Sequence, residues 1–185
     1  PTRLYNAYQS GIFPWFIDEY NHIHWYSPKN RMVLYPNEFK VSKSLKRIIK
    51  NKGFVIKSNE NFPEVINNCA NIKRKHESDT WISEEFIQAY TNLYNLDVAF
   101  SIECYMDDKL VGGLYGVLIG DVFCGESMFS REPNASKVAF YHLCQQAKEN
   151  GIKLIDCQVY NEHLSTLGAR EISREEYCRM LRSDC

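Results

Sequence analysis

The sequence lacks the patterns that would indicate a disulfide framework, a metal site or a membrane span. Seven cysteines are spread singly over 185 residues and none forms a CxxC pair. We therefore expect free thiols and a reducing, cytoplasmic environment. The Cys and His residues form no tetrahedral set, so no metal is expected. The longest apolar stretch, residues 110–120, is rich in glycine and too short to span a bilayer.

A strong net charge is also missing. The formal net charge is −1, so no global field draws the chain to nucleic acid, and any such site must be local. A hydrophobic content of 44% and a charged content of 24% are typical of a globular protein. The length fits one domain, or one domain with a small appendage, and no internal repeat is present.

One segment departs from this neutral balance. Residues 40–57 contain seven basic side chains and no acidic one, and Leu45, Ile48 and Ile49 supply an apolar side to a helix that ends at Gly53. A charge run is usually a solvated helix face. Because every charge in this run is positive and the chain as a whole is nearly neutral, the run favours contact with a phosphate backbone. Residues 73–76 form a second basic cluster.

The first 35 residues are dense in aromatic side chains. After a predicted helix over residues 2–10, the aromatics Phe13, Trp15 and Phe16 surround Pro14, and Trp25 and Tyr26 follow. Their weak periodicity predicts an irregular appendage with a small core of its own. The alternative is a stacking surface for a base, since an aromatic ring stacks on any base. From the residues alone we favour the first interpretation.

The central feature of the chain is residues 110–130, predicted as two strands joined by a turn at Gly120 and Asp121. Clustered glycines in strands mark a bulge or a close approach of the backbone to a ligand. Glu126 is a lone carboxylate among apolar neighbours. Alternation along a strand favours an outward-facing glutamate at this position. The order of helices and strands around this pair predicts an α/β protein (α+β, with a mixed sheet), with residues 1–35 as a small domain and residues 36–185 as the main one.

Seven segments, in this order and spacing, resemble the leucyl/phenylalanyl-tRNA–protein transferase family: GIFPWF, WYSPKNRMVLYP, TWI, LVGGLYGV, FCGESMFS, NASK and LIDCQ. The resemblance implies an N-acetyltransferase-like catalytic domain with a small, partly truncated N-terminal domain. It implies an enzyme that moves Leu or Phe, and less well Met, from aminoacyl-tRNA to the α-amino group of proteins beginning with Arg or Lys, marking them for N-end-rule degradation. No cofactor and no membrane are implied, and we expect a monomer.

The resemblance also implies roles for individual residues. It makes Glu126, Asp156 and Gln158 the polar catalytic centre. The substrate-binding residues it implies are Tyr8, Trp15, Trp81, Phe123, Gly125, Ser127, Met128 and Ile155, with the two tryptophans holding the terminal adenosine and Phe123, Met128 and Ile155 lining the Leu/Phe pocket. The basic run becomes a track for the tRNA backbone, through Lys40, Lys43, Lys46, Arg47 and Lys50.

The transfer reaction does not need a strong base. The donor is an activated ester, and the acceptor is an amine with a pKa of ~7.7–8.0. We expect Asp156, acting with Gln158, to orient this amine and accept its proton. Glu126 is a candidate for the acceptor's Arg or Lys side chain, its ammonium group or a ribose hydroxyl. Two alternative functions are an acetyl-CoA-dependent N-acetyltransferase, although no glycine-rich pyrophosphate loop precedes the helix at Asn134, and a non-catalytic tRNA-binding module.

Overall fold

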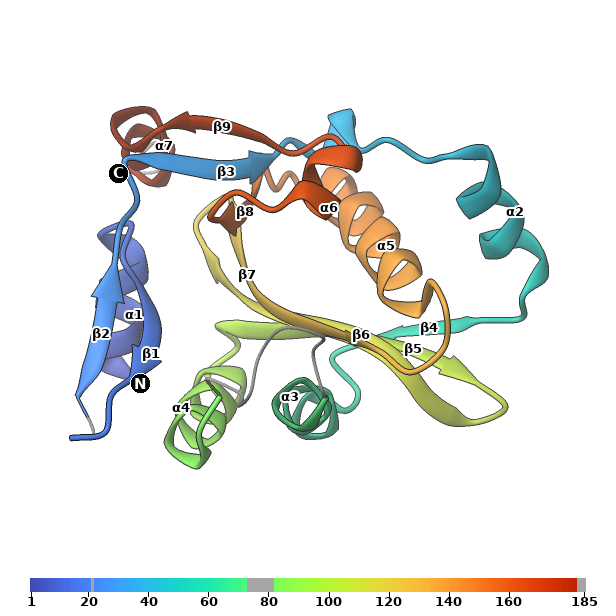
Figure 1. Ribbon diagram of the computed structural model, residues 1–185, viewed down its shortest axis with the longest axis horizontal. Helices are drawn as coiled ribbons and strands as arrows, with labels where there is room; N and C mark the ends of the chain where they lie inside the picture. The colour runs from blue at the N-terminus through green and yellow to red at the C-terminus, as the bar shows by residue number, and fades with distance from the viewer. Residues whose placement is uncertain (21, 73–81, 183–185) are drawn as a thin grey trace.

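A seven-stranded mixed sheet forms the centre of the molecule. The computed structural model describes residues 1–20, 22–72 and 82–182. The strands run in the order β4-β5-β6-β7-β8-β3-β9 (Figure 1). Only β7 and β8 are parallel; the other neighbours are antiparallel, which confirms the predicted mixed sheet. The strands are β3 (Asn30–Leu34), β4 (Val55–Ser58), β5 (Ala99–Met106), β6 (Lys109–Ile119), β7 (Val122–Ser130), β8 (Leu154–Gln158) and β9 (Arg170–Ser173).

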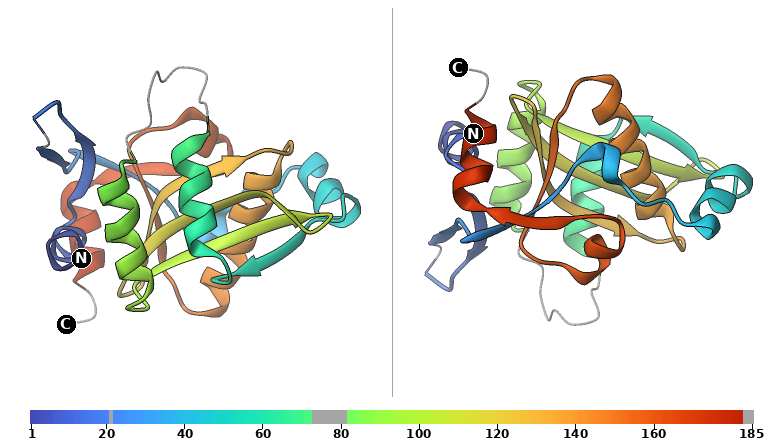
Figure 2. Two further views of the ribbon diagram at one scale, coloured as in Figure 1. Left: turned by 90° about the horizontal axis from the view of Figure 1, so that it is seen from below. Right: turned by 90° about the horizontal axis from the view of Figure 1, so that it is seen from above.

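Helices cover both faces of this sheet. On one face lie α3 (Phe62–Asn71) and α4 (Glu84–Tyr94), and on the other lies α5 (Ala135–Glu149) (Figure 2). Alternation along β6 divides the core accordingly. Tyr115 packs edge-on against Phe62 of α3, whereas Leu114 belongs to the cluster formed with α5.

The other helices lie around the ends of the sheet. They are the 3₁₀ turn η1 (Pro36–Glu38), α2 (Lys43–Asn51), α6 (Glu162–Thr166) and α7 (Arg174–Leu181). Ser173 caps α7 by accepting a hydrogen bond from the Glu176 backbone N–H. Within the described residues, no helix has the length and hydrophobicity to cross a bilayer.

The predicted irregular appendage is instead regular. After α1 (Thr2–Gln9), strands β1 (Phe13–Ile17) and β2 (Ile23–Tyr26) pair as a hairpin of their own. The register shifts between Pro14 and Phe16, and this bulge hides the alternation that would have marked a strand. Residues 30–34 enter the main sheet as β3, between β8 and β9, although they precede the expected boundary at residue 35. The division of the chain at that position stays a prediction.

The glycines of the central strand pair serve internal packing. The turn at Gly120 and the bulge between Tyr115 and Gly116 are present. A Cβ at Gly112 would lie 2.5 Å from the Cβ of Ala135, so this glycine admits the start of α5. A Cβ at Gly116 would lie 2.7 Å from the ring of Phe123. These two close approaches are between atoms of the protein itself.

Candidate active site

A cavity opens where two parallel strands stop pairing. β7 and β8 pair only from Val122 to Cys124 and from Leu154 to Asp156. The residues that follow this pairing, 125–128 on β7 and 157–158 on β8, line a cavity of about 370 Å³, closed by α5 and the α6 region. The expected site residues on β7 and β8 all line it: Phe123, Gly125, Glu126, Ser127, Met128, Ile155, Asp156 and Gln158. Phe140 and Leu143 of α5 extend its apolar wall.

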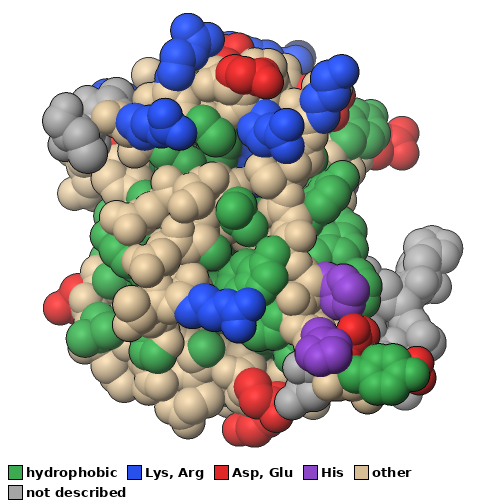
Figure 3. Space-filling model, turned by 90° about the vertical axis from the view of Figure 1, so that its left-hand side faces the viewer, with side chains coloured by type: hydrophobic (Ala, Val, Ile, Leu, Met, Phe, Trp, Pro, Cys, Tyr) green, Lys and Arg blue, Asp and Glu red, His purple; other side chains and the backbone are tan. Residues whose placement is uncertain are grey.

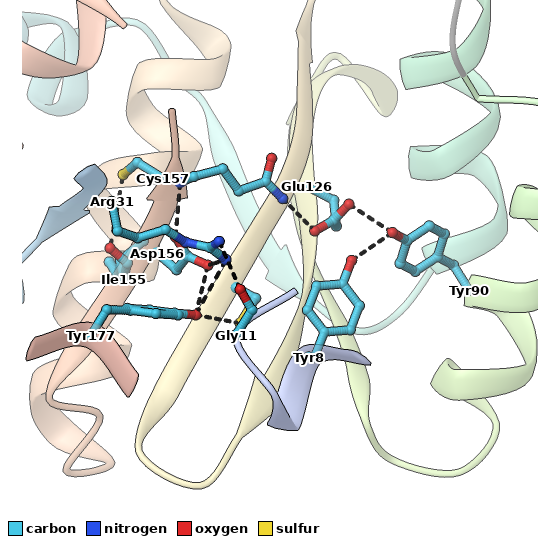
Figure 4. A network of polar contacts seen from close by, with 11 residues as sticks. Tyr8, Gly11, Arg31, Tyr90, Glu126, Ile155, Asp156, Cys157 and Tyr177 are labelled. Atoms are coloured by element: carbon cyan, nitrogen blue, oxygen red, sulfur yellow. Dashed lines mark hydrogen bonds and ion pairs between the residues drawn. The ribbon is translucent and has the colours of Figure 1, made fainter. Parts of the chain in front are cut away.

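Glu126 lies at the centre of a chain of hydrogen bonds (Figure 4). Gln158 Nε2 donates to Glu126 Oε1 at 2.7 Å, and the Tyr90 hydroxyl donates to Oε2 at 2.7 Å. The hydroxyl of Tyr8 lies 2.6 Å from that of Tyr90. When Glu126 is ionised, Tyr90 uses its proton on that carboxylate, and Tyr8 is then the donor of this last bond. The network joins α1, α4, β7 and β8.

Burial sets the acidity of these groups. It raises the pKa of Glu126 to about 8; the hydrogen bonds from Tyr8 and Tyr90 oppose this rise and the charge of Asp156 adds to it. Burial, and next the charge of Glu126, raise the pKa of Tyr8 and Tyr90 well above its usual value. Both phenols therefore stay protonated donors, while Glu126 titrates near neutral pH.

Asp156 is fully buried in a separate cluster beside this network. Arg31 pairs with it through two bonds, from Nε to Oδ1 at 2.8 Å and from Nη2 to Oδ2 at 2.5 Å. The Tyr177 hydroxyl donates to Oδ2 at 2.8 Å, and the backbone N–H of Gln158 donates to Oδ1 at 2.8 Å. The carboxylate that the sequence led us to expect as the proton acceptor thus has four donors and no exposed surface.

The cluster links distant parts of the chain. Besides Asp156, Arg31 donates to the carbonyl of Gly11 at 3.1 Å, and its guanidinium lies over the rings of Phe13 and Tyr177. Asp156 holds Gln158 by its backbone in the left-handed region, at φ 65°. A non-glycine residue in this region is uncommon and carries strain, which the surrounding bonds sustain.

Three of these residues were not expected from the sequence. Tyr90 lies on α4, and no pattern in the sequence marks its hydroxyl as part of a polar site. Arg31 and Tyr177 lie 125 and 21 residues from Asp156, and no local pattern connects them. Strand β3 carries Arg31 to the cluster, and α7 carries Tyr177. Contacts of this kind follow from the topology of the sheet.

The aromatic residues expected near the adenosine differ from one another in solvent exposure. Trp15 on β1 is 43% exposed, beside the 46% exposed Tyr26 at a ring distance of 5.5 Å. Figure 3 shows hydrophobic side chains across the face that carries α1, the hairpin and α7. Tyr8 is only 1% exposed, so its ring offers no free face for stacking. Trp81 lies outside the described residues.

The basic residues expected to contact the tRNA backbone are not gathered at the cavity. All five are exposed, on α2 and just before it: Lys40, Lys43, Lys46, Arg47 and Lys50. Helix α2 lies at the opposite end of the molecule from the β1–β2 hairpin (Figure 1). The basic cluster at residues 73–76 falls in the segment that is not described. In the described ranges, His, Cys, Asp and Glu form no group of three that could hold a metal.

Solved structures with a similar fold include an N-acetyltransferase. FemX aligns with a TM-score of 0.60 at 10% identity, covering 92% of this chain and 66% of that one. A GCN5-related N-acetyltransferase from Kribbella flavida aligns with a TM-score of 0.50 at 13% identity, covering 94% and 61%. The chain thus has the N-acetyltransferase-like fold that the sequence predicts.

Sequence relatives define the family within this fold. Residues 33–182 match the family described as leucyl/phenylalanyl-tRNA protein transferase, and residues 1–29 match its N-terminal domain. Proteins named leucyl/phenylalanyl-tRNA–protein transferase are 52% identical in Flavobacterium johnsoniae, over 99% of this chain and 86% of the relative, and 50% identical in Nitrosospira multiformis, over 98% and 78%. The chain belongs to the leucyl/phenylalanyl-tRNA–protein transferase family and is an aminoacyltransferase.

Proposed function

We propose that this enzyme transfers Leu or Phe, and less efficiently Met, from aminoacyl-tRNA to the α-amino group of proteins that begin with Arg or Lys. One observation carries the proposal. A single cavity has an apolar wall and, facing it, a carboxylate that titrates near the pKa of an α-amine. An apolar donor side chain and an attacking amine need these two surfaces side by side.

The donor side chain occupies the apolar wall in this proposal. Phe123 and Ile155 are buried, and Met128 is partly exposed toward the cavity. A pocket of this kind accepts Leu, Phe and Met and discriminates among them by shape, at ~1–3 kcal/mol per methylene. The flexible thioether of Met128 fits both branched and flat side chains. Gly125 and Ser127 flank Glu126 on the same strand and bring the backbone close to the ester.

The terminal adenosine stacks on exposed Trp15, where each base–aromatic contact is worth ~1–3 kcal/mol. Trp81 keeps the role that the resemblance implies for it. Tyr8 acts differently from that expectation: because it is buried, it supports Glu126 through Tyr90 and does not stack on the base. The N-terminal part thereby contributes to both the adenosine site and the acid–base site.

Glu126 accepts the proton of the attacking amine in this mechanism. Its pKa of about 8 suits a base that works on an amine of similar pKa near neutral pH. Asp156 is a poorer candidate, because every bonding direction of its carboxylate is taken and it has no exposed surface. We assign Asp156, with Arg31 and Tyr177, to positioning: they fix Gln158, and Gln158 fixes Glu126.

An isosteric change separates this role of Glu126 from recognition of the acceptor side chain. Glu126→Gln removes the charge and keeps the size. A base serves all acceptors alike, so transfer to peptides beginning with Arg, Lys and the neutral isostere citrulline should fall by the same factor. A loss confined to Arg and Lys would assign Glu126 to side-chain recognition instead.

The exposed basic residues of the α2 region contact the phosphates of the tRNA in this proposal. Replacing Lys43, Lys46 and Lys50 by Gln should weaken tRNA binding and reduce the slope of log K against log salt by ~0.7–0.9 for each phosphate that is no longer neutralised. Chemistry in a preformed complex should be unchanged. Exposed Lys109 and Lys148 and partly exposed Lys137, changed together, supply a control of equal charge. An equal loss in both sets would exclude a specific track.

We place the enzyme in the cytoplasm, acting as a monomer, with its product entering N-end-rule degradation. The six described cysteines are free thiols, which supports a reducing compartment. The deciding experiment is transfer of radiolabelled Leu or Phe from aminoacyl-tRNA to a peptide beginning with Arg, with a peptide beginning with Ala as the control. Transfer to the first alone is expected. Transfer to neither would contradict the proposed function, and equal transfer to both would contradict its acceptor specificity.

A further inference from the structure

A second cavity lies on the same side of the sheet as the proposed donor pocket. Its volume is about 300 Å³, and it lies between the sheet and α5. Strands β5 and β6 supply Phe100, Ile102 and Leu118, and α5 supplies Leu143 and Ala147. The site described above does not use this space.

Phe123 separates the two cavities. Phe123 and Leu143 line both of them, so each side chain presents one surface to the donor pocket and another to the second cavity. Phe123 is only 3% exposed. Its ring occupies the space left by Gly116, where a Cβ would lie 2.7 Å from two of its carbon atoms. The sheet therefore holds this ring in place as a wall.

The lining of the second cavity is mostly apolar, with polar side chains at one side. None of the residues assigned to its lining is charged. Two of the polar lining residues are bonded to each other, since Gln146 Nε2 donates to Ser58 Oγ at 2.7 Å. Asn59 and Asn150 also line the cavity. An uncharged apolar group that entered past Phe123 would meet carbon atoms before it met a polar atom.

We propose that Phe123 sets the upper length of the donor side chain and that the second cavity is a latent extension of the donor pocket. Shortening residue 123 joins the two spaces. The far end of an aromatic donor longer than Phe then lies among Phe100, Ile102 and Leu118. The proposal rests on the proposed function, because it takes the first cavity to hold the donor side chain.

The test compares donors of different length on the full chain. The donors are tRNAs charged with Leu, Phe and 4-phenylphenylalanine, and the acceptor is a peptide beginning with Arg. In Phe123→Ala, the ratio of 4-phenylphenylalanine transfer to Leu transfer should rise by about 10- to 200-fold, the range that pocket shape can discriminate. The melting temperature of each variant is measured alongside, to separate selectivity from unfolding.

A second substitution tests whether the new space is the one used. Ala147 is buried and lines only the second cavity. Adding Ala147→Leu to Phe123→Ala should abolish most of the gain. If the double variant keeps the gain, or if Phe123→Ala transfers Leu without any gain for the longer donor, the proposal is wrong. Should Phe123→Ala fail to fold, Phe123→Leu with 4-methylphenylalanine provides the same comparison. Failure of the unmodified enzyme to transfer Leu or Phe would instead contradict the proposed function.

Discussion

The dependence of the rate on pH tests the role of Glu126 most directly. Two groups must lose a proton before transfer: the acceptor amine, with a pKa of ~7.7–8.0, and Glu126, with a pKa raised to about 8 by burial. Well below pH 7 both are mostly protonated. Log kcat/KM for the acceptor peptide should therefore rise with a slope near two. At pH 7, only about one tenth of Glu126 is ionised.

Glu126→Gln removes one of these two titrations. The slope should fall from about two to about one, because only the amine still titrates. At pH 8 the rate should fall by ~10²–10⁴-fold, the usual contribution of a general base. The amide can still accept from Gln158 and can donate to Tyr90, so the network keeps its connections.

The assay is single-turnover transfer from saturating aminoacyl-tRNA to sub-saturating peptide, between pH 6 and pH 8. Glu103→Gln is the matched control, since Glu103 is a fully buried carboxylate on β5 that does not line the cavity. Its slope should stay near two. A slope of two in Glu126→Gln, or a loss of less than tenfold at pH 8, would show that another group accepts the proton.

Three further predictions concern this network and the Asp156 cluster beside it. Tyr90→Phe removes a hydrogen bond that lowers the pKa of Glu126, so the pH–rate curve should shift to higher pH in the same assay. The folded enzyme holds the Glu126 proton more tightly than the unfolded chain, so its stability falls as pH rises from about 4.5 to about 8, by on the order of a few kcal/mol. Glu126→Gln should thus melt higher than the unmodified enzyme at pH 8.5 and equally at pH 5, and equal melting at both would contradict the raised pKa. Arg31→Met leaves a buried carboxylate unpaired and should cost ~3–5 kcal/mol in urea unfolding, with recovery when Asp156→Leu is added. No recovery would show that the cluster contributes through contacts other than the ion pair.

The sequence by itself predicted much of the lining of the cavity between β7 and β8. The cavity lining from β7 and β8 comes from two continuous segments, and adjacent pairing of these strands brings both segments to one place. Glu126, Gln158 and Phe123 could be named in advance because the resemblance to the family rests on these two segments, whereas strand alternation alone favoured an outward-facing Glu126. The mixed sheet was predicted from the order of helices and strands along the chain.

The tertiary structure alone decided how these side chains are solvated and partnered. At the level of sequence, Glu126 and Asp156 have the same chemistry. The fold leaves Glu126 partly exposed, with a raised pKa, and it buries Asp156 against Arg31 and Tyr177. It also buries Tyr8, expected from the resemblance to bind substrate, as a hydrogen-bond partner of Tyr90, 82 residues away. The physical reason is that desolvation and long-range hydrogen bonds depend on which helices and strands the order of the sheet brings together. Residues so far apart in the chain share no sequence periodicity, so no sequence pattern indicates that they will be in contact.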